Sequence, residues 1–256
     1  MEATKTHFFG DMGVMLGRSM RHVSRSMDTI ITVAITPIAI MLLFVYVFGG
    51  AIQTGTENYV SYVLPGILLI AIASGTSYTA YRLFMDMQRG IFERFHSMPI
   101  APSAALWGHV LTAMVSSAIS VVVIILVGLL LGFRSSAGIG SWLAVAGILA
   151  LFTLALTWVA AIAGLSAKSV DGVSAFSFPL IFLPFISSAF VPTKSMPAVV
   201  RIFAENQPVT SIVQSIRALL SGQPVGNDIW IALAWCLGIL IVAYVFAMRT
   251  YKRTAS

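Results

Sequence analysis

Charge is scarce in this chain, and its scarcity excludes most classes of soluble protein. Only 9% of the 256 residues are charged and 58% are hydrophobic, with a mean hydropathy of +0.94. Soluble domains have about 25% charged residues. The composition therefore predicts an integral membrane protein. Its apolar runs are much longer than the roughly 10 residues of a membrane β-strand, so we expect an all-α protein with spans of about 20 residues.

Reactive and ligand-binding groups are also few. The sequence contains no Gly-Lys pair, so it has no Walker A loop to hold a nucleotide phosphate. The only cysteine is Cys236, which excludes an intrachain disulfide. No cluster of carboxylates, His or Cys resembles a metal or hydrolytic site. We expect no enzyme activity, cofactor or metal in this chain.

Six uncharged apolar runs predict six spans, at about 29–49, 58–81, 103–133, 141–167, 172–191 and 230–248. None contains Asp, Glu, Lys or Arg, the groups that ion-coupled transporters and proton pumps usually use as relays. His109, near the inner end of the third span, is interpreted as a packed or interfacial histidine. A transporter of this composition must take its energy from a partner.

The basic residues indicate the orientation of these spans. With both termini in the cytoplasm, 11 of the 15 Lys and Arg lie on the inner side. The net charge of +6 therefore reflects membrane topology, and no nucleic acid partner is expected. We predict one multi-pass domain, residues 1–256, in the plasma membrane.

The first part of this domain, residues 1–27, is expected to be an amphipathic helix at the inner membrane surface. Apolar residues recur from Phe8 to Met27, and Arg18 and Arg25 are seven residues apart. No apolar segment with a cleavage site precedes it, so no signal peptide is expected. Residues 28–256 would form the six-helix membrane domain.

Residues 82–102 are the one stretch with charges of both signs between two long apolar runs. The spacing of Asp86, Arg89 and Glu93 places them on one helical face, and Phe92 and Phe95 add apolar side chains. This pattern predicts a short docking helix, ended by prolines at 99 and 102. The alternative is an ordinary basic cytoplasmic loop.

Two further regions leave alternatives open. In the fifth span, Pro179, Pro184 and Pro192 predict either a broken helix that lines a cavity or a kinked, packed helix. In the second span, the small residues Ala71, Gly75 and Thr79 favour close helix packing over a polar pathway. The side chains that we consider as pathway lining are Tyr46, Ser74, Tyr78, Tyr81, Phe178 and Phe182.

The long connection before the sixth span predicts two short helices. Ser195 as N-cap and Pro197 in the first turn would begin a helix that runs to about Ala204. A second helix would end before Gly222. Its apolar face consists of Val209, Ile212, Val213, Ile216, Leu219 and Leu220. Neither helix is long enough to cross a membrane, so we expect both to dip into it from outside.

The segment RGIFERFHSMPIAPSAALWGHVL closely resembles the one after the second span in permeases of type-2 ATP-binding cassette (ABC) exporters. It looks most like the daunorubicin-resistance drug-export permeases, and SSAFVPTKSMP and NQPVTSIVQSIRALLSG are similar to them as well. The resemblance implies a coupling helix that docks on an ATPase, and re-entrant helices between spans five and six. The coupling residues would be Arg89, Gly90, Ile91, Phe92, Glu93, Arg94, Phe95, His96 and Pro99.

The resemblance also implies the partners. Two copies of an ABC ATPase would bind ATP and Mg, and a second copy of this permease or a related one would complete the pathway. Hydrophobic or amphipathic drugs, antibiotics or lipids are the expected substrates. The alternatives are export of a polysaccharide or lipid-linked glycan, and a membrane scaffold without transport; an intramembrane enzyme is disfavoured by the lack of reactive groups.

Overall fold

The computed structural model describes residues 27–49, 59–90 and 104–254. All regular structure in these ranges is helical. The elements are α2 (Met27–Leu42) with a π-helical continuation (Leu43–Phe48), α3 (Tyr59–Gln88), α5 (Ala104–Leu130), α6 (Ile139–Ser166), α7 (Val170–Phe182) with a 3-10 continuation (Leu183–Ile186), a 3-10 turn (Thr193–Ser195), α8 (Ala198–Asn206), α9 (Pro208–Leu220) and α10 (Asp228–Thr254).

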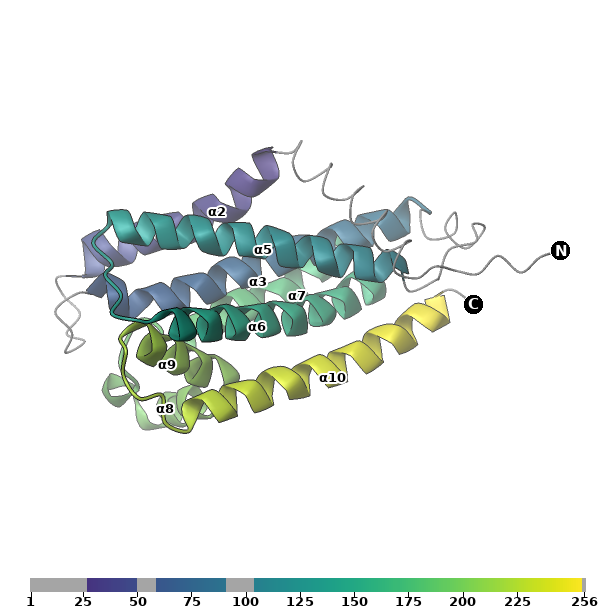
Figure 1. The fold of residues 1–256 in the computed structure, drawn as a ribbon. Coiled ribbons are helices and arrows are strands. Elements are labelled where there is room, and N and C mark those ends of the chain that lie inside the picture. Colours follow the sequence, from purple (N-terminus) through teal and green to yellow (C-terminus); the bar gives the residue numbers. More distant parts are fainter. Residues whose placement is uncertain (1–26, 50–58, 91–103, 255–256) are drawn as a thin grey trace.

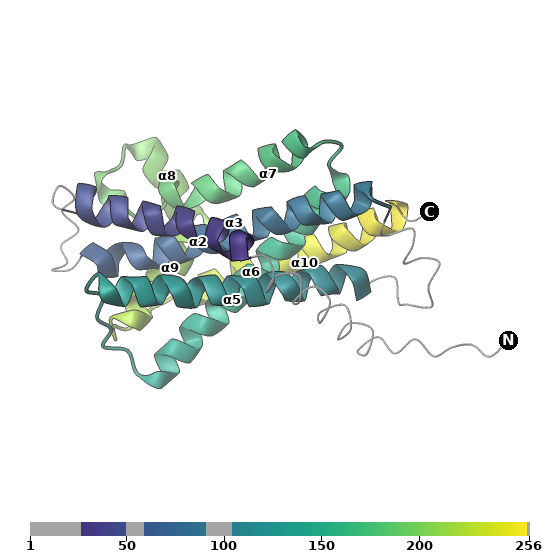
Figure 2. The same cartoon turned by 90° about the horizontal axis from the view of Figure 1, so that it is seen from above.

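The long helices lie lengthwise beside one another, with α3 at the centre (Figures 1 and 2). This helix packs against α2, α5, α6, α7 and α9, and every residue from Tyr62 to Ala73 is buried. A helix that is apolar all round belongs in the interior of a bundle. Helices α8 and α9 lie at one end, here termed the α9 end. The C-terminus of α10 lies at the other, termed the Asp86 end after the residue near the C-terminus of α3 (Figure 1).

Four of the helices are long and apolar enough to cross a membrane: Tyr59–Gln88, Leu106–Leu130, Ile139–Ser166 and Asp228–Tyr251. They correspond to the second, third, fourth and sixth predicted spans. The predicted first and fifth spans contain the shorter apolar helices Ile35–Phe48 and Val170–Ile186. A multi-pass all-helical protein is therefore confirmed, whereas the count of six spans stays a prediction.

The predicted fifth span is broken rather than only kinked. The α-helix ends at Phe182, a 3-10 turn follows to Ile186, and Pro184 lies within that turn. A proline removes a backbone donor and clashes with the carbonyl four residues earlier, which favours the end of the α-helix here. Of the two alternatives, the broken helix is observed, and helical structure ends at Ile186, before the predicted end of the span.

The two short helices of the long connection are present, with one correction. Ser195 is not the N-cap of α8, because its hydroxyl donates to the Pro192 carbonyl (2.7 Å) within a separate 3-10 turn and Pro197 occupies the cap position. Helix α9 agrees closely with the sequence pattern: all six residues of its predicted apolar face are buried. Gly222, with φ +65°, follows its end.

Small residues let neighbouring segments approach α3 closely. A Cβ atom on Gly66 would lie 2.6 Å from the Cβ of Ala189, and one on Gly164 would lie 2.7 Å from the Ala80 carbonyl oxygen. Ala71 and Thr79 of the predicted small-residue ridge are buried, while Gly75 is half-buried. Close packing around α3 is therefore observed, with Gly66 and Gly164 at its tightest points among the described glycines.

Candidate functional site

The candidate site is the Asp86 end of the bundle, where α3 and α5 flank residues 91–103. Helix α3 does not stop after the apolar run but continues through Arg82 and Asp86 to Gln88. Arg89 and Gly90 then form a turn in which the Gly90 N–H donates to the Met87 carbonyl (3.1 Å) and Gly90 has φ +64°. The expectation that Asp86 and Arg89 belong to one docking helix is wrong, because the helix ends between them.

The remaining predicted coupling residues, from Ile91 to Pro99, lie outside the described residues. So does nearly all of the predicted amphipathic helix, residues 1–27. Their roles stay predictions. What the structure does describe is the pair of helix ends from which the 91–103 segment leaves and to which it returns.

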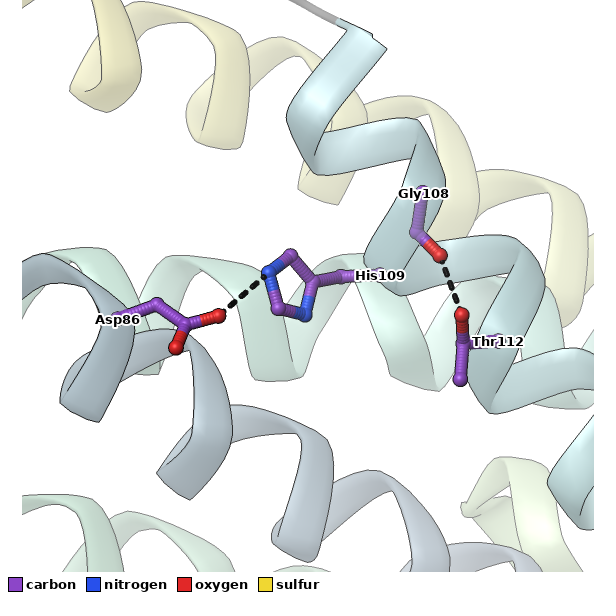
Figure 3. Close-up of polar contacts among 4 residues, drawn as sticks. All are labelled: Asp86, Gly108, His109 and Thr112. Atoms are coloured by element: carbon purple, nitrogen blue, oxygen red, sulfur yellow. Dashed lines mark hydrogen bonds and ion pairs between the residues drawn. The ribbon is translucent and has the colours of Figure 1, made fainter. Parts of the chain in front are cut away.

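These two helix ends are joined by a polar side-chain contact. His109 on α5 places Nε2 3.2 Å from Oδ2 of Asp86 on α3 (Figure 3). The His109 side chain is 15% exposed and that of Asp86 is 26% exposed, so the contact is partly shielded from solvent. Thr112, one turn further along α5, donates instead to the Gly108 carbonyl of its own helix (2.7 Å; Figure 3). Of the side chains on α5 that are drawn in Figure 3, only His109 therefore contacts α3.

Aromatic side chains fix the same part of α5 to the rest of the bundle. The ring centroids of Trp107 and Trp158 are 5.2 Å apart in an edge-to-face arrangement, and those of Trp158 and Tyr244 are 4.8 Å apart. Trp158 is fully buried, and these contacts connect α5, α6 and α10. Edge-to-face aromatic pairs stabilise by about 0.5–1.5 kcal/mol beyond area burial. The start of α5 is thus held on two sides.

The pathway candidates do not form one cluster by their ring contacts. Tyr78 contacts Tyr81 with ring centroids 6.4 Å apart, and Phe178 contacts Phe182 at 6.5 Å, each pair within one helix. Tyr46 is 73% exposed, and Ser74 is half-buried. Their part in a pathway stays a prediction.

A larger aromatic cluster was missed by the sequence analysis. Phe44 stacks on Phe190 with centroids 4.3 Å apart, Phe190 stacks on Phe185 at 5.0 Å, and Phe182 adjoins Phe185 at 5.9 Å. It joins the π-helical continuation of α2 to the broken end of α7. Phe182, Phe185 and Phe190 lie close together in the sequence, but Phe44 comes from a distant segment that no local periodicity relates to them.

The described residues hold no group of three or more His, Cys, Asp or Glu that could bind a metal ion. Among the described residues, the Asp86 end pairs a carboxylate with an imidazole between two helices. Its chemistry suits the mechanical connection of helix ends.

Comparison with known proteins identifies the family. The sequence profile described as ABC-2 type transporter matches residues 11–221. The chain belongs to this family. The match covers α3, α5, the segment between them and α9, so the resemblance inferred from the sequence is confirmed.

Relatives of this ABC-2 chain carry the names of drug-resistance permeases. It is 29% identical to the daunorubicin resistance ABC transporter permease protein DrrB1 of Streptomyces coeruleorubidus, over 98% of this chain and 87% of that protein. It is 26% identical to the probable doxorubicin resistance ABC transporter permease protein DrrC of Mycobacterium tuberculosis, over 93% and 87%. A putative transport permease, ycf38 of Cyanophora paradoxa, is 26% identical over 85% and 77%.

Proposed function

We propose that this chain is the permease subunit of an ATP-driven exporter, with ATP hydrolysis supplied by a separate ABC ATPase. Family membership over residues 11–221 carries the proposal. The absence of any Gly-Lys pair from the sequence supports a separate ATPase, because a Walker A loop needs one. The permeases it resembles are named for daunorubicin and doxorubicin resistance.

The coupling site would be the segment between α3 and α5. Residues 89–99 would dock on the ATPase, and movement there would reach the bundle through the two helix ends that Asp86 and His109 tie together (3.2 Å). A displacement of the docked segment would then move α3 and α5 as a pair. Because α3 packs against five other helices, such a movement would be distributed through the whole bundle.

The exported substrate would be hydrophobic or amphipathic, such as a drug, an antibiotic or a lipid. The chain presents aromatic side chains on the exposed faces of α3 and α7, including Tyr78, Tyr81, Phe178 and Phe182. Two permease copies, or one copy and a related permease, would enclose the pathway. Export of a polysaccharide or lipid-linked glycan, and a scaffold without transport, are the competing functions.

The proposal is tested by removing the apolar side chains expected to dock on the ATPase. Truncation of a well-buried interface aromatic costs about 2 kcal/mol or more, roughly 30-fold in affinity. The double substitution Phe92→Ala with Phe95→Ala should leave a membrane-inserted permease that loses its ATPase and no longer exports. The measurement is the amount of ABC ATPase, by quantitative mass spectrometry, that co-purifies with tagged permease from its host.

A matched control uses two phenylalanines of another element, α7. Phe178→Ala with Phe182→Ala should retain the ATPase at the parent ratio, because both rings lie on α7, and should alter export. If the chain is a scaffold without transport, it should co-purify with its ATPase, and deletion of the chain should leave export unchanged. Parent-level ATPase retention and export by the Phe92 and Phe95 double variant would refute the coupling assignment.

A further inference from the structure

Among the described residues at the α9 end of the bundle, Arg217 on α9 makes several side-chain contacts with other elements. Its Nη2 atom donates to the Tyr62 carbonyl (3.0 Å) on α3 and to the Ser188 carbonyl (2.9 Å) after the break in α7. Its Nε atom also donates to the Tyr62 carbonyl (3.3 Å). The guanidinium carbon lies 3.7 Å from the centroid of the Tyr62 ring, within the range of a cation–π contact. One side chain thus connects three elements.

The break in α7 explains why donors are needed here. Once the helix ends, the carbonyls of residues 186–190 have no regular helical partners, and a buried carbonyl without a donor is costly. Gln207 Nε2 donates to the Ile186 carbonyl, and Tyr59 Oη donates to the Phe190 carbonyl (3.2 Å). With Arg217 on Ser188, side chains from α3, α9 and the residue before α9 satisfy this segment.

The segment itself is tightly seated. Ser187, Ser188, Ala189 and Phe190 are all buried, and Gly66 of α3 leaves just enough room for Ala189. In the part of the chain that the structure describes, Arg217 forms no ion pair with a carboxylate. Its positive charge therefore serves to bind carbonyl dipoles and an aromatic face.

We propose that Arg217 is a positioning residue that holds the non-helical segment after α7, residues 187–190, against α3, and so keeps the α9 end of the bundle closed. The inference rests on the proposed function where it gives this closure a role in transport. In an exporter, this end must open to release substrate. Arg217 would then determine how often residues 187–190 separate from α3.

A planar fork is required, not only a positive charge. Arginine offers five donors in a fixed plane and stacks on aromatic rings, whereas lysine is a compact point charge. Burial lowers the pKa of the Arg217 guanidinium because the charged form loses solvation, while Tyr62 acts in the opposite direction. Arginine nevertheless stays protonated near neutral pH. The contact should therefore depend on side-chain shape rather than on pH.

The test measures how often residues 187–190 separate from α3 and expose Ser188. Ser188 is buried and its hydroxyl has no hydrogen-bond partner among the described residues, so Ser188→Cys in a Cys236→Ser background is a nearly isosteric reporter. The rate of reaction with N-ethylmaleimide is followed by mass spectrometry on the purified, full-length permease. Arg217→Gln should increase this rate by roughly tenfold or more, since hydrogen bonds from a charged donor are lost. Arg217→Lys should increase it to a similar degree.

Two controls separate positioning from general stability. Tyr62→Phe loses the hydroxyl but keeps both the ring and the backbone carbonyl that Arg217 contacts, so the reporter rate should rise much less than in Arg217→Gln. Native Cys236, buried in α10, reports opening of the whole bundle when Ser188 is retained. Its rate should change little with Arg217→Gln.

An unchanged Ser188→Cys rate in Arg217→Gln would overturn the proposal. An equal rise at Cys236 would overturn it too, because Arg217 would then support the whole fold rather than this segment. A parent-level Ser188→Cys reaction rate in Arg217→Lys would show that positive charge alone suffices and would reject the requirement for a planar guanidinium. The assay needs neither ATPase nor substrate, so its failure would leave the proposed exporter function standing, and failure of that function would leave this result intact.

Discussion

At the scale of single residues, the contact between Asp86 and His109 carries the candidate site. The two side chains approach to 3.2 Å at the ends of consecutive long helices. Each is partly exposed, so solvent weakens the attraction between them. Exposed and partly exposed ion pairs typically contribute about 0.2–1 kcal/mol. The pair is therefore better suited to orienting α3 against α5 than to stabilising the bundle.

A double-mutant cycle tests this contact. Asp86→Ala and His109→Ala should show a coupling energy of about 0.5–1 kcal/mol, because each removes the same interaction. Asp86→Ala with Thr112→Val is the matched control, since Thr112 donates only within its own helix among the hydrogen bonds observed. Its coupling should be near zero. The measurement is the free energy of unfolding in mixed micelles, and equal coupling in both cycles would contradict the pairing.

This contact shows what sequence patterns could not provide. The sequence placed Asp86 on a docking helix with Arg89 and described His109 as packed or interfacial. Helical periodicity relates residues three or four positions apart, whereas these two lie on different helices with residues 91–103 between them. The apolar run also ended before Arg82, although helix α3 continues to Gln88. The sequence pattern named this region as the coupling site, which stays a prediction, but it did not indicate the contact between Asp86 and His109.

At the scale of elements, proline illustrates both the use and the limit of sequence reasoning. Pro65 lies inside α3 and Pro37 inside α2, and both helices continue. Pro179 is likewise inside α7, and the α-helix ends only near Pro184. Which proline ends a helix depends on whether neighbours can satisfy the freed carbonyls. At the end of α7 they do so through side chains such as Arg217 and Gln207.

Helix α9 was predictable for the opposite reason. Its apolar residues recur at helical spacing on one face, and all of them are buried against the bundle. Such a pattern depends only on local sequence and on the presence of a core. The start of α8 was less predictable, because Ser195 forms a 3-10 turn with Pro192 instead of capping the helix.

The close approach of α3 to the segment after α7 yields a second prediction. Gly66→Ala would place a Cβ atom 2.6 Å from the Cβ of Ala189 and 3.3 Å from the Phe190 ring. We expect a loss of about 1–3 kcal/mol in unfolding free energy, because the backbones must separate. Thermal unfolding of the purified variant measures this loss.

Gly147→Ala is the matched control for this substitution. Gly147 also lies within a long helix, α6, but a Cβ atom there would meet nothing within 4 Å. Alanine should be neutral there or stabilise by up to about 1 kcal/mol through helix propensity. A Gly66→Ala variant as stable as the parent would show that the segment after α7 shifts freely.

At the scale of the whole molecule, large apolar side chains remain exposed along the bundle. They include Leu126 on α5, Phe178 on α7 and Val242 on α10, each more than half exposed. A water-soluble protein rarely leaves so much apolar surface uncovered. Lipid, together with the second permease of the proposed complex, would cover these faces. This agrees with the low charge content from which the membrane assignment was made.

The last prediction concerns the orientation of this bundle in the membrane. The loop before α6 and the loop after α9 lie at the same end, because Ser135 Oγ donates to the Leu220 carbonyl (2.7 Å). The connection between α6 and α7, which contains Lys168, lies at the opposite end (Figure 1). The predicted orientation places the α9 end outside the cell, where only four of the 15 Lys and Arg fall.

Single cysteines test this orientation in a Cys236→Ser background. Ser136→Cys and Gln223→Cys occupy exposed positions at the α9 end, and Lys168→Cys occupies an exposed position at the other. In intact cells, an impermeant maleimide should label the first two, whereas Lys168→Cys should react only after the membrane is opened. Because all three positions are exposed, a difference in labelling reports sidedness rather than burial. If Lys168→Cys alone were labelled in intact cells, the bundle would have the opposite orientation. Residues 89–99 would then not face a cytoplasmic ATPase.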